Sequence, residues 1–562
     1  MSDTKAGGYV SKIKFNDGQE LAVEKNDIVV FVGPNNAGKS QSLKDIYKLS
    51  SKKMPSVVVS DVTITKYQVT ISPLLKRISP ENNQGTHKSY QHFTKTINLY
   101  SNSEKDFLNG TVFGEFRDLF IANLNTSARL TICDPPQIIK RNSAKQHPIH
   151  YAAFDGKYRK WLSDNFKRAF NIEVIPNTQF GSQIPLSMGE PVKFDREFED
   201  EQSRQEAYAE VIDTYKQVQD QGDGIKSFTG ILLYLMLDYY CIYLIDEPES
   251  FLHPPQAKIM GQIIGQTLKD DQQAFISTHS EDIIKGLLET CPNRIKIIRI
   301  TREGDVNKFS ILNNENFNGV WNDPLLKYSN IMSSLFHKSV ALCESDSDCK
   351  MYSIIENHIK HNEGKYSETL FVHCGGKHRM ARIASALRLL NVDVKLIPDI
   401  DIMNDKNVFK GVVEAFGIEW ETIRSDYNVV VSNLHSEKEK IDRNTAKASI
   451  TSILNQSQNA NLSAREMASI CDIIRTISKW DNIKKMGVAA IPPDEPTVSF
   501  KRMEKTLKSN QIYIVPVGEL ECFVKEVGGH GSEWVNEVLE KYPDLEDDVY
   551  HEITEFVRGM NL

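Results

Sequence analysis

An apolar run followed by a glycine-containing turn constrains the fold of the N-terminal part most strongly. Residues 28–32, IVVFV, form a β-type run, and GPNNAGKS follows at 33–40 before a helical pattern begins. This is the spacing GxxxxGK[ST] with a strand before it and a helix after it, the context that a phosphate-binding loop requires. The glycines let backbone N–H groups wrap phosphates at a helix N-terminus. The pattern predicts an α/β core with a nucleotide site at this turn.

The residues of this turn are expected to hold ATP and Mg²⁺. Lys39 would reach the β- and γ-phosphates, and the Ser40 hydroxyl would hold Mg²⁺. The other residues of the turn predicted to contact the nucleotide are Asn35, Asn36, Gly38 and Gln41.

A second segment is predicted to complete the nucleotide site. Residues 241–245, CIYLI, form a buried-type strand that ends at Asp246 and Glu247. Asp246 is placed to hold Mg²⁺ through water, and Glu247 is placed to activate the attacking water. A further strand pattern within 272–284 ends at THS, where His279 is predicted to sense the γ-phosphate. Solvated acids at a strand end would not explain DEPE followed by LHP.

Three segments resemble the ABC-type ATPase heads of the structural-maintenance-of-chromosomes and repair class, namely 33–40, LIDEPE at 244–249 and STHS at 277–280. The resemblance implies that two heads dimerise and trap ATP between them. The signature motif that traps ATP would lie within 221–240, and Gly222 stands where the family usually has serine. Residues 50–220 lack sustained heptads, which excludes a long coiled-coil arm.

Acidic residues follow two predicted strands in the C-terminal part. SVALC at 339–343 leads to Glu344, and Asp348 lies at the start of a predicted helix. The run DVKLIP ends in Asp399 and Asp401. Alternating β and α segments give a parallel sheet, and acids at the carboxyl ends of its strands converge at one edge. Clustered carboxylates are costly without a hard cation, so the sequence predicts a site for Mg²⁺ or Mn²⁺.

The strand-end glutamate followed by DxD resembles a Toprim domain, with Ser345 in place of the family's glycine. A strand pattern at 510–517, NQIYIVPV, leads to GELE at 518–521, and this segment resembles the closing element of the Toprim domain in overcoming-lysogenization-defect (OLD) family nucleases. That resemblance implies that Glu521 joins the second metal site. It also implies a catalytic lysine further on, for which Lys525 and Lys541 are both candidates.

The OLD resemblance covers nearly the whole chain and implies an ATP-regulated, divalent-metal-dependent DNA endonuclease that acts in anti-phage defence. Two metal ions would clamp the scissile phosphate. The family also implies a homodimer or higher oligomer through the ATPase heads. It further implies control by a helicase-like partner or by a reverse transcriptase with its RNA–DNA hybrid. Lys377 is expected to contact phosphate, and Glu519 is a weaker candidate ligand.

Two other functions fit parts of the sequence. One is an ATP-driven sensor or switch whose Toprim domain binds nucleic acid or a partner without cutting. The other, a topoisomerase or primase, is disfavoured because no zinc pattern appears and the ATPase is of a different class.

The expected organisation is an ABC-type P-loop ATPase head followed by a Toprim α/β domain. The ATPase would occupy 1–315, with an insertion at about 55–220. A join at 316–335 would lead to the Toprim domain at 336–562, which carries a helical insertion at about 405–505.

The net charge of −8 argues against a surface coated with basic groups, although a local basic groove is still compatible with it. Residues 137–168 are locally basic with interleaved aromatic residues, a pattern that an ordinary solvated helix also produces. No run of about 18 apolar residues predicts a membrane span, and no signal peptide is expected. The eight scattered cysteines form no CxxC pair. These features together predict a cytoplasmic protein with reduced thiols.

Overall fold

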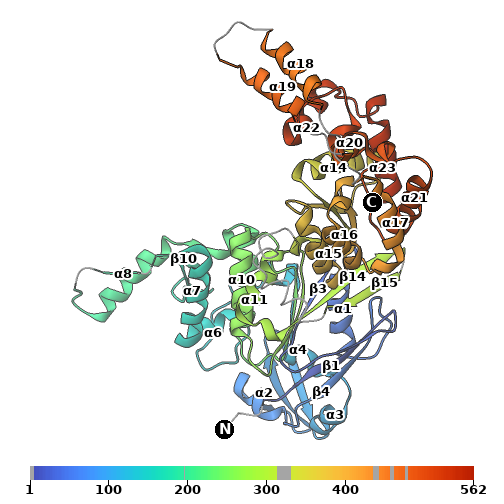
Figure 1. The fold of residues 1–562 in the computed structure, drawn as a ribbon. Helices are drawn as coiled ribbons and strands as arrows, with labels where there is room; N and C mark the ends of the chain where they lie inside the picture. Colours follow the sequence, from blue (N-terminus) through green and yellow to red (C-terminus); the bar gives the residue numbers. More distant parts are fainter. Residues whose placement is uncertain are drawn as a thin grey trace. The chain divides into compact units, whose positions relative to one another are not determined.

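The computed structural model describes residues 5–190, 192–194, 197–304, 306–312, 331–434, 442–455, 461–474 and 479–562. The chain separates into two compact units, Met1–Gly319 and Val320–Leu562, and both mix helices with strands (Figure 1). The predicted join at 316–335 lies outside the described residues as far as residue 330.

A six-stranded sheet organises the first unit. Its strand order is β15-β14-β3-β13-β12-β8, and only the edge strand β15 runs antiparallel to its neighbour. The strands are β3 (Ile28–Val32), β8 (Ile121–Leu124), β12 (Ile242–Asp246), β13 (Gln273–Ser277), β14 (Ile295–Glu303) and β15 (Val306–Ile311). All five residues of β3 are buried, as expected for a central parallel strand with both faces covered.

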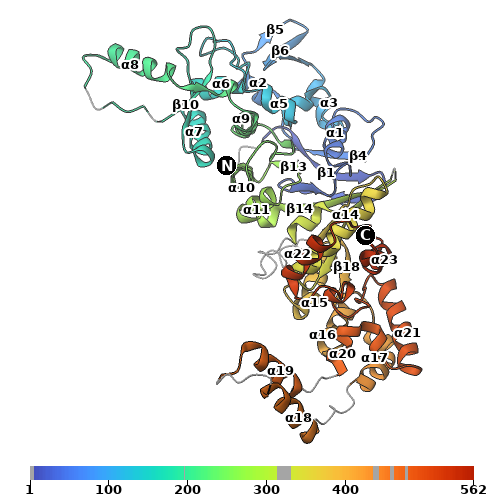
Figure 2. The ribbon, with the colours of Figure 1, turned by 90° about the horizontal axis from the view of Figure 1, so that it is seen from above.

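Helices and smaller sheets surround this sheet. The helices named below are α1 (Lys39–Leu49), α2 (Ser72–Ile78), α5 (Thr126–Thr131), α6 (Pro148–Phe154), α7 (Gly156–Phe170), α8 (Glu201–Asp213), α9 (Asp223–Leu235), α10 (Pro254–Thr267) and α11 (Glu281–Thr290). Helices α10 and α11 pack against each other, and Figure 2 shows them side by side as Figure 1 does. A second sheet has the order β2-β1-β4, built from Glu20–Ala22, Gly8–Phe15 and Val59–Lys66.

The predicted insertion at about 55–220 is not a single excursion from the core. Within it, β4 pairs with β1, and β8 forms an edge of the six-stranded sheet beside β12. Two smaller sheets also belong to this segment. In sequence, one lies between β4 and β8 and consists of β5 (Asn82–Asn83), β6 (His87–His92) and β7 (Lys95–Tyr100). The other follows β8 and consists of β9 (Glu173–Pro176), β10 (Leu186–Gly189) and β11 (Lys216–Gln217). Strand β8 escaped prediction because its four residues IANL are too short to show a period.

The second unit contains a parallel sheet of the order β17-β16-β18, formed by Thr369–His373, Ser339–Cys343 and Asp393–Ile397. Helix α14 (Asp346–Asn362) follows β16, and α15 (Met380–Leu389) precedes β18. A hydrophobic core joins β16 and α14 to α22 (Gly531–Lys541) and α23 (His551–Met560). This β-α-β-α-β order brings the carboxyl ends of three strands to one edge.

The segment 510–517, predicted to be the closing strand, forms only one parallel bridge, from Ile512 to Leu396 of β18. The N–H of Tyr513 also donates to the Leu396 carbonyl at 2.8 Å. The N–H of Val515 donates to the Pro398 carbonyl at 3.0 Å. Pro398 has no N–H to return to this segment, so the ladder does not extend into a full strand.

The described parts of the segment in which a helical insertion was expected, at about 405–505, contain six α-helices. They are α16 (Lys406–Ala415), α17 (Trp420–Leu434), α18 (Arg443–Leu454), α19 (Ala464–Ile474), α20 (Lys479–Met486) and α21 (Glu495–Ser509). Helices α18 and α19 lie side by side in both views (Figures 1 and 2). Across the part of the chain that the structure describes, no helix has both the length and the apolar character needed to cross a membrane.

Helix α5 packs closely against α9 at Gly230, so we predict that Gly230→Ala destabilises the first unit. Alanine normally stabilises a helix interior by about 1 kcal/mol relative to glycine. At Gly230, however, a Cβ would collide with the backbone carbonyl of Arg129 on α5. We expect a net loss of about 1–3 kcal/mol, measured as a lower midpoint of thermal unfolding.

The matched control is Gly559→Ala in α23, where a Cβ would meet no atom within 4 Å. This variant should be neutral or slightly more stable. Equal midpoints for wild type and Gly230→Ala would contradict the packing argument.

Candidate nucleotide and carboxylate sites

The turn between β3 and α1 is shaped for a phosphate-binding loop. Gly33 has φ +140°, and a Cβ there would collide with the carbonyl oxygen of Ile300. Gly38, with φ +102°, is the N-cap of α1. Only glycine adopts these conformations without strain. The buried Lys39 ammonium donates to the carbonyl oxygens of Gly33 at 2.9 Å and Pro34 at 2.6 Å, so it lies inside the turn.

Two opposing effects act on the pKa of the Lys39 ammonium. Burial lowers its pKa to about 8, although the carboxylates of Glu247, Glu249 and Asp246 act in the opposite direction. The ammonium is therefore mostly charged at pH 7, and its hydrogen-bond partners are neutral carbonyls. Phosphate oxygens would be stronger acceptors for it than these carbonyls.

The other predicted residues of the turn lie around this lysine. Asn35 and Asn36 are exposed, and Asn36 has a left-handed backbone with φ +59°. Ser40 is half-buried in the first turn of α1. The Gln41 amide instead donates to the Asp45 carboxylate at 2.8 Å, along the helix and not toward the turn.

The acids after β12 lie close to the residues after β13. The Ser277 hydroxyl donates to the Asp246 carboxylate, and the Glu247 N–H donates to the Ser277 carbonyl at 2.9 Å. The Glu247 carboxylate lies 3.8 Å from Nε2 of His279. Burial, followed by the charge of Lys39, lowers the pKa of His279 to about 4. His279 is therefore neutral at pH 7, beside the carboxylate predicted to activate water.

Arg129 is a residue of this site that the sequence interpretation missed. Its side chain is fully buried on α5, and its guanidinium donates to the backbone carbonyls of Asp246 and, at 3.1 Å, Glu247. Glu247 has φ +48°, which is uncommon for a residue with a Cβ. Arg129 thus holds the backbone of the two acids, and nothing in TSARLT distinguishes this arginine from a surface residue.

The predicted signature segment forms the start of α9. Gly222 is its N-cap without a side-chain cap, and a Cβ at Gly224 would collide with the carbonyl of Phe251. Ser227 is fully buried, and its hydroxyl has no hydrogen-bond partner among the described residues.

In the second unit, the predicted acids gather beyond β16 and β18. Glu344 follows β16, and Asp399 and Asp401 follow β18, with Asp401 in a short 3₁₀ turn (Ile400–Asn404). Asp348 is the third residue of α14 and forms a capping box with Ser345. Its carboxylate accepts the Ser345 N–H at 2.8 Å, so the capping geometry fixes its position.

Two lysines neutralise one of these acids. The ammonium groups of Lys377 and Lys484 lie 3.0 and 3.1 Å from the same carboxylate oxygen of Asp401. Lys484 also lies 3.8 Å from Glu519. Lys377 was predicted to contact phosphate. Lys484 was not identified, because it lies in α20, far from the acids in sequence.

Glu521 anchors the loop that precedes α22. Its carboxylate accepts the Gly531 N–H at 2.7 Å and lies 2.7 Å from Nδ1 of His530. The predicted lysines are placed differently. Lys525 is exposed, and Lys541 donates to the backbone carbonyl of Glu526 at 3.2 Å. No contact found among the described residues joins either lysine to the carboxylates.

Burial makes ionisation of this cluster unfavourable. It raises the pKa of Glu344, Asp348, Asp399 and Glu519. Asp399 is shifted well above its usual range, first by burial and then by the charges of Asp348 and Glu344. Oxygen Oε2 of Glu344 is buried and has no partner among the described residues. The cluster therefore carries more potential negative charge than its lysines offset.

The donor chemistry of this cluster fits a hard divalent cation, because every candidate ligand is a carboxylate and one buried oxygen is unpaired. In the described ranges, however, no three His, Cys, Asp or Glu side chains are grouped so that they would hold an ion. The capping bond holds Asp348 in place, and the two lysines hold Asp401.

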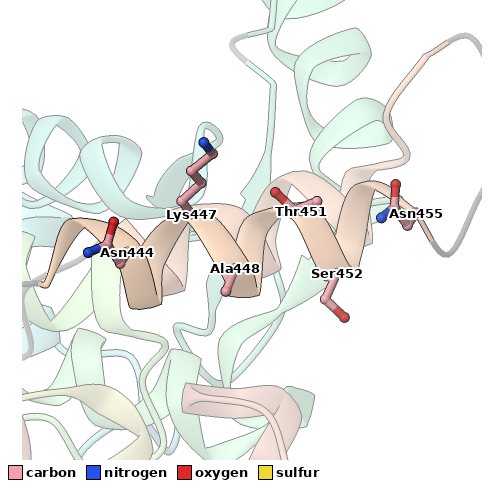
Figure 3. A pocket seen from close by; sticks show the side chains of 6 residues that line it. All are labelled: Asn444, Lys447, Ala448, Thr451, Ser452 and Asn455. Carbon is pink, nitrogen blue, oxygen red and sulfur yellow. The ribbon is translucent and has the colours of Figure 1, made fainter.

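A hollow beside α18 is lined by no acidic residue among those that the structure describes. Its lining residues all belong to that one helix, and Figure 3 shows them along its length: Asn444, Lys447, Ala448, Thr451, Ser452 and Asn455. A single basic residue and small polar side chains on one helix do not form a catalytic group.

Comparisons with known proteins identify the first unit's chemistry. A family model described as "AAA domain, putative AbiEii toxin, Type IV TA system" matches residues 150–284. The Old nuclease of Escherichia phage P2 is 20% identical over 324 residues, which cover 54% of this chain and 49% of that protein. The uncharacterized protein MJECL11 of Methanocaldococcus jannaschii is 36% identical over 69 residues, 12% of this chain and 60% of that protein. The chain thus spans about half of the curated relatives' length.

Solved structures with similar parts include SMC heads. The SmcHead bound to the C-winged helix domain of ScpA has a TM-score of 0.31 at 13% identity, over 56% of this chain and all of that chain. The SMC head domain from Thermotoga maritima has a TM-score of 0.27 at 12% identity, over 55% of this chain and 97% of that chain. The family match and the phosphate-binding turn together identify a P-loop ATPase domain, in a mixed α/β chain that is distantly similar to the Old nuclease.

Lys39→Ala removes the buried ammonium, and we predict that it weakens ATP binding about tenfold or more. A hydrogen bond from a charged donor contributes about 1.5–3 kcal/mol, and Lys39 is the charged donor inside the turn. Titration with a fluorescent ATP analogue measures the change.

The control is Lys44→Ala, which removes an exposed lysine from the same helix and should bind normally. In both variants, the second unit should unfold at the same temperature as in wild type. Unchanged ATP affinity in Lys39→Ala would disprove the assignment of the turn.

The raised pKa of Asp399 predicts that Asp399→Asn stabilises the second unit at neutral pH in EDTA. Between the unfolded pKa of about 4 and the raised folded pKa, the folded state binds more protons. The free energy of unfolding of wild type therefore falls as pH rises through this window. Asparagine removes the buried charge, so the gain in thermal midpoint should be largest at pH 7 and vanish near pH 4.

Asp346→Asn is the matched control, since Asp346 is an exposed acid in the first turn of α14 that pairs with Lys350 at 2.8 Å. It should give no gain at pH 7. A midpoint for Asp399→Asn that is shifted equally at both pH values would contradict the pKa argument.

Proposed function

We propose that this protein is an ATP-regulated, divalent-metal-dependent DNA endonuclease of the OLD type. The observation that carries the proposal is the cluster of buried acids beyond the carboxyl ends of β16 and β18. Burial raises the pKa of Glu344, Asp348 and Asp399, and the charges of Asp348 and Glu344 raise that of Asp399 further. Uncompensated buried carboxylates destabilise a fold, and carboxylates with strongly shifted pKa values are concentrated at functional sites. The similarity to the Old nuclease supports the same function.

The residues proposed to hold the metal ions are Glu344, Asp348, Asp399, Asp401 and Glu521. Bound Mg²⁺ or Mn²⁺ would supply Lewis acidity toward a phosphodiester and lower the pKa of a water molecule. The chain's own cations have a complementary role. Lys377 and Lys484 bind Asp401 in the structure, and their ammonium groups would be available to phosphate oxygens once Asp401 is otherwise neutralised. They would hold the scissile strand in place.

In the ATPase, Lys39 and Ser40 are proposed to bind the phosphates and Mg²⁺, and Asp246 to hold Mg²⁺ through water. Glu247 would accept a proton from the attacking water. The neutral imidazole of His279, 3.8 Å from Glu247, would donate toward the γ-phosphate. Arg129 acts through the backbone of both acids and is a positioning residue.

Dimerisation through two ATPase heads, a role in anti-phage defence and control by a partner extend this proposal. The partner would be a helicase-like protein or a reverse transcriptase with its RNA–DNA hybrid. A nuclease that damages host DNA requires such restraint, and a head whose ATP site is completed by a second copy would provide one means of control.

A second candidate function is an ATP-driven switch that binds nucleic acid without cutting it. The arrangement around Asp401 favours it, since two lysines already share this carboxylate and the described side chains form no ready metal site.

Plasmid cleavage with Mg²⁺ or Mn²⁺, with and without ATP, tests the proposal. We expect metal-dependent cutting by wild type and a loss of more than a hundredfold in Asp399→Ala. Lys484→Ala should lose about tenfold, because it removes one charged contact to phosphate. The sign of the ATP effect gives the direction of regulation.

Lys485→Ala is the matched control, since it removes the neighbouring, exposed lysine of α20. It should cut like wild type. DNA binding without cutting by wild type, in both metals and with candidate partners added, would refute the nuclease and favour the switch.

A further inference from the structure

Two hollows of the ATPase unit share one wall. The first, of about 340 Å³, is lined by residues that include Arg77, Arg141, Lys145, Tyr151, Phe154 and Tyr158. The second, of about 480 Å³, is lined by residues that include Lys5, Arg77, Lys269, Asp238 and Asp271. Arg77 and Asp238 line both hollows, so the two adjoin, and together they are called here the Arg77 groove.

The Arg77 groove has a surplus of positive charge in a chain whose net charge is −8. Five lysines and arginines line it, against the three aspartates Asp155, Asp238 and Asp271. Asp238 is shared, at 3.5 Å, between Arg77 and Lys269. One carboxylate therefore offsets two cations, which leaves the groove attractive to anions.

Two cations, Arg141 and Lys145, lie at the other end of the groove. Among the described residues, no carboxylate pairs with the exposed Arg141. The Lys145 ammonium donates to the backbone carbonyls of Arg141 at 2.5 Å and Ser143 at 3.2 Å. It also lies 5.0 Å from the ring centroid of Phe154. Two charges at this end are thus available to an anionic ligand.

Aromatic rings lie beside these cations and support one another. Tyr151 contacts Tyr158 edge to face at a centroid distance of 5.7 Å, and Tyr239 lies 6.4 Å from Tyr151. The rings come from α6, α7 and the segment before β12. Asp155 caps α7 by accepting the Lys157 N–H at 2.8 Å, which fixes the junction between the two helices. The rings are therefore held on rigid elements.

We propose that the Arg77 groove binds single-stranded nucleic acid, with backbone phosphates on Arg141, Lys145 and Arg77 and an unpaired base stacked on the half-buried rings of Tyr151 and Tyr158, while the buried Tyr239 supports Tyr151 from behind. Grooves that combine cations with aromatic rings bind single strands in this way, largely without regard to sequence. A duplex hides the faces of its bases, and a small inorganic anion makes no use of the rings. The inference builds on the proposed function, since it specifies the form of nucleic acid that the ATPase unit would hold.

Fluorescence anisotropy tests the inference with a labelled oligothymidylate of about 20 nucleotides, longer than the ~4–16 nucleotides that such a site covers. The buffer contains EDTA and no ATP, so cutting does not contribute. Parallel titrations use an oligouridylate, an abasic strand of equal length and a duplex. We expect both single strands to bind, and the abasic strand and the duplex to bind about tenfold more weakly or worse.

Two variants separate the phosphate contacts from the stacking. Arg141→Ala, at an exposed position that does not threaten folding, should weaken binding and reduce the salt dependence by about 0.7 in log–log slope. Tyr158→Ala should weaken oligothymidylate binding about tenfold while leaving abasic binding unchanged. Tyr158→Phe, which keeps the ring, should bind like wild type and guards against a folding effect.

The matched control is Lys160→Ala. Lys160 is two positions beyond Tyr158 on α7, toward the opposite side of the helix, and pairs with Asp164 at 2.8 Å. It should bind like wild type. Equal oligothymidylate binding by Arg141→Ala, Tyr158→Ala and wild type would overturn the inference, as would equal binding of abasic and intact strands.

These readouts do not depend on cleavage. A protein that binds single strands through the groove but never cuts would contradict the proposed nuclease and support this inference. A protein that cuts DNA, and whose groove variants bind and cut like wild type, would support the proposed nuclease and contradict this inference.

Discussion

Negative charge buried at the carboxyl end of a parallel sheet is the constraint on which the second unit depends. Strand β16 carries no charged residue, and the acids of the cluster lie beyond the carboxyl ends of β16 and β18. Burial and mutual repulsion raise the pKa of Asp399 well above its usual range. The surrounding segments supply the compensation, since Lys377 comes from the turn after β17 and Lys484 from the helical region. The loop before α22 is likewise fixed by the Glu521 carboxylate.

The two candidate sites share one electrostatic arrangement. In each, a lysine lies near several carboxylates and makes hydrogen bonds that a phosphate could replace. Lys39 donates to carbonyl oxygens within reach of the charges of three acids, and Lys377 donates to the carboxylate and the backbone carbonyl of Asp401. A bound anion would find a cation already in place to pair with its charge. In the proposed function, both lysines would bind phosphate by the same physical means.

Positioning in the ATPase relies on backbone contacts as much as on side chains. Glu247 adopts a left-handed conformation, and its backbone is held by Arg129 and Ser277. Strain of this kind persists only where the surroundings enforce it, and it commonly occurs at functional turns. The glycines at 33 and 38 meet the same need at the phosphate turn, where a Cβ is excluded or the φ angle is positive.

The sequence alone determined the local features of this protein. The spacing GxxxxGK[ST] after IVVFV fixed the phosphate turn, and apolar runs ending in acids located β12, β16 and β18, because short-range periodicity and glycine content express backbone requirements directly. Only the tertiary structure decided which distant residues complete the sites. Arg129, Lys484 and the edge strand β8 carry no local signal, since their roles arise from contacts across many residues of chain. The sequence also suggested a closing strand at 510–517, and the structure forms one bridge there, because Pro398 at the end of the partner segment cannot donate.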